Sequence, residues 1–179
     1  NNIEKVLKDF LEEIAINLEK FRDEYQKSND KQKFLTSTKN ILGNVINDSK
    51  LIELTSMDKE TFKNKINNLY DLKRKERINI VGSEENDDLE KKIFLQIIDF
   101  SWRSHLQYLE QLRQVIGLRS YGQKDPLSEF KKESFVLFEN LLDKIKKDEI
   151  KFLFNLNIVV SNQKKTIHFK ISKDLFNKI

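Results

Sequence analysis

The sequence contains no cysteine, one proline, four glycines and two histidines. Without cysteine there is neither a disulfide framework nor a thiolate metal site, which is typical of a protein from the reducing cytoplasm. The two histidines, His105 and His168, have no second histidine or glutamate at metal-ligand spacing, so a catalytic metal site is not indicated. Because glycine and proline are scarce, turns are few and we expect a mostly helical chain.

Several sequence signals for catalysis and membrane insertion are also missing. There is no glycine-rich phosphate loop of the G-x-x-x-x-G-K-[ST] type and no G-x-S-x-G nucleophile turn, so no catalytic centre or ATP site is indicated. No apolar run approaches the roughly 18 residues of a membrane span, and no secretory signal precedes the first predicted helix. The first residue is Asn rather than Met, and we therefore expect a piece of a longer protein.

Charged residues are plentiful and mixed in sign along the chain. The 33 basic and 29 acidic residues give a net charge of +4 without forming a basic block. A nucleic-acid-binding helical domain is suggested only by the basic isoelectric point, and we expect no nucleic-acid partner. Apolar residues make up 38% of the sequence, including 13 Phe, which is enough to bury a core.

Two apolar stripes flank a short polar loop at residues 119–125. Before the loop, steps of three and four residues predict one face of a helix that begins near residues 83–88 and reaches Ile116. This stripe comprises Leu95, Ile98, Trp102, His105, Leu109, Leu112 and Ile116. After the loop, Asp125 is placed to cap a second helix whose first residue is Pro126. So short a connection predicts two antiparallel helices, with Gly117 and Gly122 marking the end of the first.

The rest of the chain predicts three more helices and two strands. The helices cover residues 3–25, residues 34–43 and a segment that follows Asp58 and ends in the basic cluster 73–77, which we interpret as solvated. Residues 44–56 are expected to be irregular. From Phe154 onward the apolar period changes to two, which predicts strands at 154–160 and 166–171 joined by a loop at 161–164.

Tyr121 is the main candidate for a contact residue. It lies between Ser120 and Gly122 at the predicted hairpin tip, and amphipathic aromatic residues are used disproportionately in contacts. Two interpretations are open: a contact role, or a ring folded back on its own loop. Arg119 and Lys124 beside it either contact carbonyl or acidic groups of a partner or point to water.

The residues around the loop resemble a known family. The segments WRSHL (102–106), LRQVIGLRSYGQKDP (112–126) and EFKKESF (129–135) are similar to the two-helix finger of SecA, the motor of bacterial preprotein translocase. The resemblance runs almost without gaps from Leu95 to Leu156. Residues 62–81 resemble the end of the helical wing domain, and residues before 44 fit only by pattern.

The resemblance implies a mainly α fold in three parts. Residues 1–85 would form a helical wing-like subdomain, residues 86–155 the two-helix finger of the helical scaffold, and residues 156–179 a C-terminal strand or linker segment with a small β-hairpin. The family's motor motifs, its preprotein-crosslinking domain, its long scaffold helix and its cysteine-rich zinc tail are absent. Residues 158–179 also differ from the family's usual linker.

The resemblance also implies roles for particular residues. The finger of SecA reaches the cytoplasmic mouth of the SecY channel and contacts the moving polypeptide through its tip, which here comprises Tyr121, Arg119, Gln123 and Lys124. The hairpin also touches the nucleotide-binding domains and restrains ATP turnover. That regulatory contact would correspond to Trp102, Arg103 and His105. Apart from this resemblance, we interpret His105 as a core or interhelix hydrogen-bonding residue and Trp102 as a packing anchor.

The implied setting is the bacterial Sec export pathway. The parent protein would be a cytoplasmic ATPase peripherally associated with the inner membrane, while this fragment would neither hydrolyse ATP nor hold a cofactor, since ATP and Mg²⁺ bind in the missing motor domains. Its partners would be the SecY channel, unfolded preprotein and other SecA domains. Because the scaffold helix is missing, we also expect the apolar stripe to self-associate or to be covered by the C-terminal tail.

A rival interpretation belongs to another class of protein. A free-standing helical adaptor would bind a partner's helix through the hairpin stripe and have no link to ATP. A reading frame that continues upstream into a phosphate-binding loop would distinguish the translocase fragment from this adaptor.

Overall fold

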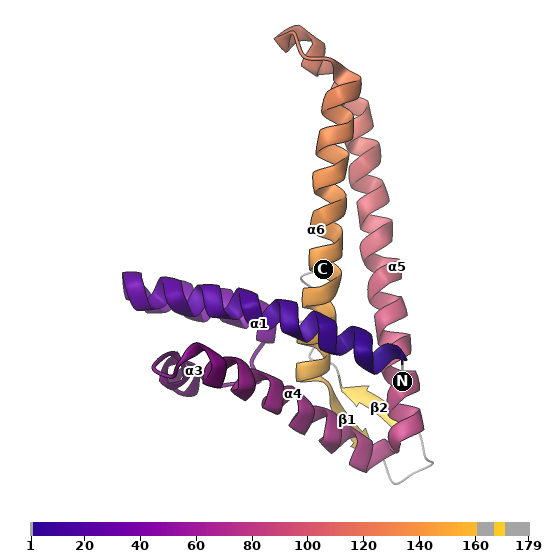
Figure 1. The fold of residues 1–179 in the computed structure, drawn as a ribbon. Helices are drawn as coiled ribbons and strands as arrows, with labels where there is room; N and C mark the ends of the chain where they lie inside the picture. Colours follow the sequence, from indigo (N-terminus) through magenta and orange to yellow (C-terminus); the bar gives the residue numbers. More distant parts are fainter. Residues whose placement is uncertain (1, 161–166, 171–179) are drawn as a thin grey trace. The chain divides into compact units, whose positions relative to one another are not determined.

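The computed structural model describes residues 2–160 and 167–170, with side-chain burial for residues 2–158. Within this part the chain forms six α-helices, one 3-10 helix and two strands (Figure 1). These are α1 (Asn2–Ser28), α2 (Lys31–Leu42), α3 (Asp48–Thr55), α4 (Lys59–Val81), α5 (Ser83–Val115), η1 (Ile116–Gly122), α6 (Pro126–Asn155), β1 (Asn157–Val160) and β2 (Ile167–Lys170). The mainly α fold predicted from the sequence is confirmed.

The chain forms two compact units. One contains residues 2–91 and the described residues from 147 onward, and the other contains residues 92–146. Helices α5 and α6 therefore each contribute to both units. These units are defined by compactness alone, and the division into a wing-like part, a finger and a C-terminal segment stays a proposal.

The core of the first unit lies where α1 packs along α2 and α4. The apolar face of α1 is buried as its periodicity predicts, and it comprises Leu7, Leu11, Ile14 and Leu18. On α4, Phe62 and Ile66 are completely buried. Each such side chain contributes roughly 1.5–3 kcal/mol through removal of apolar surface from water, so this face accounts for much of the unit's stability.

Polar contacts fix the C-terminal part of α1 to the connection between α3 and α4. The Gln26 amide donates to the carbonyl oxygen of Thr55 at 2.8 Å. The buried guanidinium of Arg22 donates to the carbonyl oxygen of Met57 and to the Asp23 carboxylate. The Gln26 bond occupies the last carbonyl oxygen of α3, which its own helix leaves without a partner, and the Arg22 bond occupies a carbonyl in the connection that follows.

Helix α3 corrects the expectation that residues 44–56 are irregular. The Asn47 side chain accepts a hydrogen bond from the Lys50 backbone N–H at 2.9 Å, which caps the helix. Leu51 and Leu54 are buried on its inner side. The prediction was wrong because two buried leucines in eight residues are too few to show a period.

The end of α2 confirms the predicted helix stop at Gly43. Gly43 has φ +68°, a conformation that glycine adopts at low cost. The Asn155 side chain lies against it: its Nδ2 donates to the Leu42 carbonyl at 2.8 Å, and its Oδ1 accepts from the Asn44 N–H at 3.2 Å. A side chain at the end of α6 thus provides hydrogen-bond partners for a backbone carbonyl and a backbone N–H where α2 ends.

Strands β1 and β2 pair antiparallel, with Asn157 opposite Lys170 and Ile158 opposite Phe169. The predicted β-hairpin is confirmed for these residues, whereas the expected loop 161–164, Thr166 and Ile171 lie outside the described residues. The first strand was predicted to begin too early. Phe154 belongs to the last turn of α6, and its buried ring packs edge-on against Tyr70 with centroids 5.4 Å apart.

The second unit contains most of the predicted helical hairpin, in which α5 and α6 run side by side and η1 connects them (Figure 1). Its buried positions are Ile93, Ser101, His105, Leu141 and Ile145. The predicted stripe is therefore only partly right, because Leu95 is 60% exposed and Trp102 is 46% exposed. The predicted and observed faces agree from His105 onward, where Leu109, Leu112 and Ile116 are half-buried, and they diverge before it, where Leu95 and Trp102 are exposed.

Candidate contact site at the hairpin tip

The tip of the hairpin is more regular than the loop expected from its polar sequence. Helix α5 ends at Val115, and residues 116–122 continue as the 3-10 helix η1. The Ser120 hydroxyl donates to the Gly117 carbonyl at 2.8 Å. Gln123 ends this helix in the left-handed region, and its N–H donates to the Ser120 carbonyl. The tip therefore has a defined backbone.

Tyr121 is 88% exposed at this tip. A ring folded back on its own loop would be largely covered, so this alternative does not describe the structure. A large amphipathic ring held in water by an ordered backbone can meet a partner without first breaking internal contacts. That Tyr121 contacts a partner stays a prediction.

The two basic residues of the tip are paired with carboxylates on α6. The Arg119 guanidinium donates to Glu133 at 2.8 Å, and the Lys124 ammonium lies 3.3 Å from Glu129. The Lys124 ammonium, with a further hydrogen bond from Lys132, holds the pKa of Glu129 below its ordinary value. Each pair joins the tip to the first turns of α6, so both cations have intramolecular partners as well as exposed surface.

The start of α6 is as predicted. The Asp125 carboxylate accepts hydrogen bonds from the Ser128 hydroxyl at 2.6 Å and from the Ser128 backbone N–H at 2.9 Å, while Pro126 is the first helical residue. These two bonds lower the pKa of Asp125. The cap fixes where α6 begins and hence where the tip ends.

The second predicted group lies on α5 in the body of the hairpin. His105 is 6% exposed and lies between two aromatic rings, with centroids 5.5 Å from Trp102 and 6.1 Å from Phe138. Arg103 is exposed. The structure brings Trp102 and His105 together and directs Arg103 to solvent, and their contact with motor domains stays a prediction.

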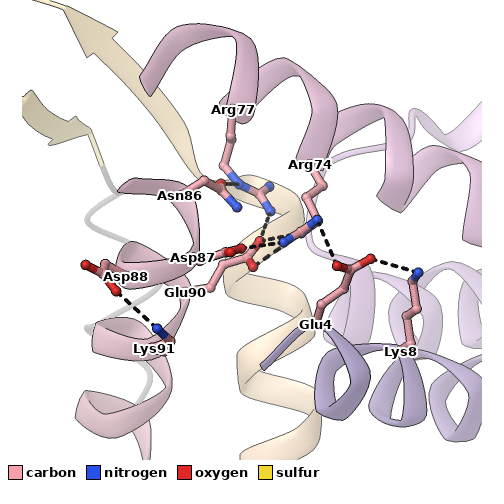
Figure 2. Close-up of polar contacts among 9 residues, drawn as sticks. All are labelled: Glu4, Lys8, Arg74, Arg77, Asn86, Asp87, Asp88, Glu90 and Lys91. Atoms are coloured by element: carbon pink, nitrogen blue, oxygen red, sulfur yellow. Dashed lines mark hydrogen bonds and ion pairs between the residues drawn. The ribbon is translucent and has the colours of Figure 1, made fainter. Parts of the chain in front are cut away.

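A second polar cluster, which the sequence analysis missed, lies where α4 meets the first turns of α5 (Figure 2). Arg77 is 3% exposed and Glu90 is 0% exposed, and they are joined by a hydrogen bond of 3.0 Å. Arg74 donates to the same carboxylate at 3.1 Å and to Asp87 at 2.7 Å. The interpretation of residues 73–77 as a solvated helix end is therefore wrong for its two arginines.

Arg77 uses all three of its guanidinium nitrogens in this cluster. Its Nε donates to Asn86 at 3.2 Å, its Nη2 to Glu90, and its Nη1 to the Leu153 carbonyl on α6 at 2.9 Å. One side chain thus connects three helices. A signal was present in the sequence, because the face of α4 that carries Phe62 and Ile66 continues at helical spacing to positions 70, 74 and 77.

The cluster extends to the first helix through Glu4. Its carboxylate lies 2.9 Å from the Lys8 ammonium and 3.7 Å from the Arg74 guanidinium (Figure 2). These two cations lower the pKa of Glu4. Because these contacts are partly exposed, we expect the loss of Glu4 to cost less stability than the loss of either Arg77 or Glu90 alone.

Two other features are absent from the part of the chain that the structure describes. Among residues 2–160 and 167–170, no group of three or more His, Cys, Asp or Glu side chains is arranged to hold a metal ion. In the same part of the chain, no helix is both long and apolar enough to cross a membrane.

These features define a class of helical proteins in which a long two-helix hairpin presents an exposed aromatic residue at its tip. The chain belongs to the SecA family: residues 1–157 match the family model of the SecA Wing and Scaffold domain. The predicted resemblance is confirmed, and it extends to the first residues, which had fitted only by pattern.

Curated relatives agree with the family. The chain is 48% identical over 161 residues to the protein translocase subunit SecA of Pelagibacter ubique, covering 88% of this chain and 19% of that protein. It is 40% identical over 108 residues to SecA of Solibacter usitatus, covering 60% of this chain and 11% of that one. SecA of Campylobacter lari is 44% identical over 93 residues, or 52% of this chain and 11% of its own length. The chain thus spans a fifth or less of these relatives.

Proposed function

We propose that this chain is the wing and finger region of a protein-translocating ATPase, and that the hairpin couples ATP-driven motion elsewhere in the parent to movement of polypeptide through the SecY channel. In this proposal ATP and Mg²⁺ bind in parts of the parent outside this chain, which itself carries out no covalent chemistry. The parent would act at the cytoplasmic face of the inner membrane, with unfolded preprotein as substrate.

The observation that supports this proposal is the exposure of Tyr121 on an ordered tip. Its ring has an apolar face and a hydroxyl, so it can engage polypeptide segments of varied composition. The pairs Arg119–Glu133 and Lys124–Glu129 hold the tip to α6. A tip that is fixed to its helices can transmit displacement of those helices to whatever Tyr121 contacts.

The test is a translocation assay with the full-length parent carrying Tyr121→Ala. We expect the rate of preprotein transport into SecY-containing vesicles to fall severalfold or more while ATP binding is unchanged, because the substitution removes a contact group without touching a nucleotide site. Tyr121→Phe should retain most transport, since the apolar ring is preserved.

Tyr108 provides a matched control for this experiment. It is the same residue type, 60% exposed, on the body of the same hairpin. Tyr108→Ala should reduce transport much less than Tyr121→Ala. Transport that is unchanged by Tyr121→Ala, or reduced equally by both substitutions, would remove the assignment of Tyr121 as the contact residue.

A further inference from the structure

Glu149 lies on α6 with no exposed surface. Neither of its carboxyl oxygens has a hydrogen-bond partner among the described residues. An ionised carboxylate in such a place would lack both hydration and donors, which is costly enough that a buried acid normally takes up a proton instead.

The charged groups around Glu149 come from two other helices. From α4, Arg77 reaches the Leu153 carbonyl, one helical turn after Glu149, and Tyr70 lies close enough for the two residues to interact electrostatically. From α5, Glu90 acts on Glu149 as a like charge. Farther from Glu149, Arg74 pairs with both Glu90 and Asp87. The Glu4 carboxylate on α1 in turn lies 3.7 Å from the Arg74 guanidinium.

Arg74 and Arg77 donate hydrogen bonds to Glu90, and neither donates to Glu149. Each nitrogen of Arg77 donates to another acceptor, namely Asn86, Glu90 and the Leu153 carbonyl, and Arg74 donates to Glu90 and Asp87. Two carboxyl groups therefore share one buried region, and only Glu90 receives guanidinium hydrogen bonds. In such pairs the carboxyl group that receives hydrogen bonds from cations is stabilised as the anion, and the other is stabilised as the neutral acid.

We propose that Glu149 is a proton-binding site: at neutral pH it is held as the neutral acid beside ionised Glu90, and loss of its proton weakens the packing of the end of α6 against α4. Burial first, and then the negative charge of Glu90, raise the pKa of Glu149 from 4.5 to about 8, while Arg77 opposes the shift. Tyr70 is also buried, which raises the pKa of its phenol, so this neighbour stays neutral.

The direction of the pH effect follows from proton linkage. Between pH 4.5 and about 8 the folded chain keeps a proton on Glu149 that the unfolded chain has lost. The contribution of Glu149 to the free energy of unfolding therefore decreases as pH rises through this window. Above the pKa of the folded state the full destabilisation is present. An ordinary salt-bridged carboxylate gives the opposite trend.

The test uses the 179-residue chain and the variant Glu149→Gln, whose amide matches the neutral acid in size and charge. Urea unfolding would be measured at about pH 6 and about pH 9. Between these two pH values, we expect the folded-to-unfolded ratio to fall in both chains. The fall should be roughly ten- to a hundredfold larger for the unsubstituted chain than for Glu149→Gln. Glu139→Gln, an exposed position on the same helix, should keep the unsubstituted pH dependence.

A direct measurement covers the case in which the variant does not fold. The carbon-13 chemical shift of the Glu149 carboxyl in the unsubstituted chain should be that of the neutral acid at pH 7. It should change to that of the carboxylate with a midpoint near the raised pKa of about 8. A carboxyl carbon already ionised at pH 7, or a Glu149→Gln variant with the same pH dependence as the unsubstituted chain, would overturn the proposal.

Discussion

Arg77 and Glu90 carry opposite charges at positions with almost no access to water, 3% and 0% exposed respectively. The free energy of such a pair depends on whether both members are present. Their mutual attraction and the bonds to Asn86 and Leu153 offset the desolvation of both ions, so the intact pair contributes little net stability. Removal of one member leaves the other charged and buried.

Arg77→Met is therefore expected to destabilise the chain by about 3–5 kcal/mol, the usual cost of leaving one buried ion without its partner. The measurement is the free energy of unfolding from urea titration at neutral pH. Lys91→Ala serves as the control, because Lys91 belongs to an exposed pair with Asp88 in the same region (Figure 2), and its loss should change stability by less than about 0.5 kcal/mol.

A double substitution tests the same pair in a second way. Glu90→Gln combined with Arg77→Met should cost less than the sum of the two single changes, because the buried charge is gone. Additive costs would show that Arg77 acts through packing and its backbone bond to Leu153 rather than through its charge.

At the scale of elements, the contact between the ends of α2 and α6 depends on Gly43. Gly43→Ala is expected to lower the free energy of unfolding by more than about 1 kcal/mol, since a Cβ at φ +68° is strained and would also overlap the Asn155 side chain. Gly117→Ala is the matched control: its added Cβ would meet nothing within 4 Å. A Gly43→Ala chain as stable as the control would contradict the role assigned to Asn155.

The helices also show which local signals identify an element. The Asp125 cap with Pro126, and the stop at Gly43, were sufficient to place two boundaries, because capping chemistry acts within a few residues. Helix α3 was missed because its evidence is tertiary: Leu51 and Leu54 are buried by neighbouring helices. The stripe on α5 was wrong before His105, because that helix has more apolar residues there than its partner helix covers.

At the scale of the whole molecule, several large apolar side chains of the hairpin are exposed. On α5, Leu95, Trp102 and Leu106 share one face at steps of seven and four residues, and on α6, Phe135, Phe138 and Leu142 share another. In the parent we propose that other SecA domains cover part of this surface. The expected alternative, coverage by the C-terminal tail, concerns residues outside the described part of the chain.

We accordingly expect the isolated 179-residue chain to self-associate, because exposed apolar surface of this extent favours association. Sedimentation velocity over a range of concentrations should show species larger than a monomer. Phe135→Lys should shift the distribution toward monomer, whereas Leu72→Lys, at an equally exposed position outside the hairpin (57% exposed), should not. A strict monomer at every concentration, with little binding of hydrophobic dyes, would contradict this expectation.

The sequence by itself determined the helical class, the hairpin with its capped second helix, the position of Tyr121 at the tip and the family to which the chain belongs. These follow from periodicity, capping and motifs, which act over short stretches of chain. Only the tertiary structure showed that the buried Arg77 and the half-buried Arg74 both donate to Glu90, and that Glu149 receives none of their hydrogen bonds. The physical reason is that desolvation depends on which helices pack together, and residues more than seventy positions apart in sequence meet only in the folded chain.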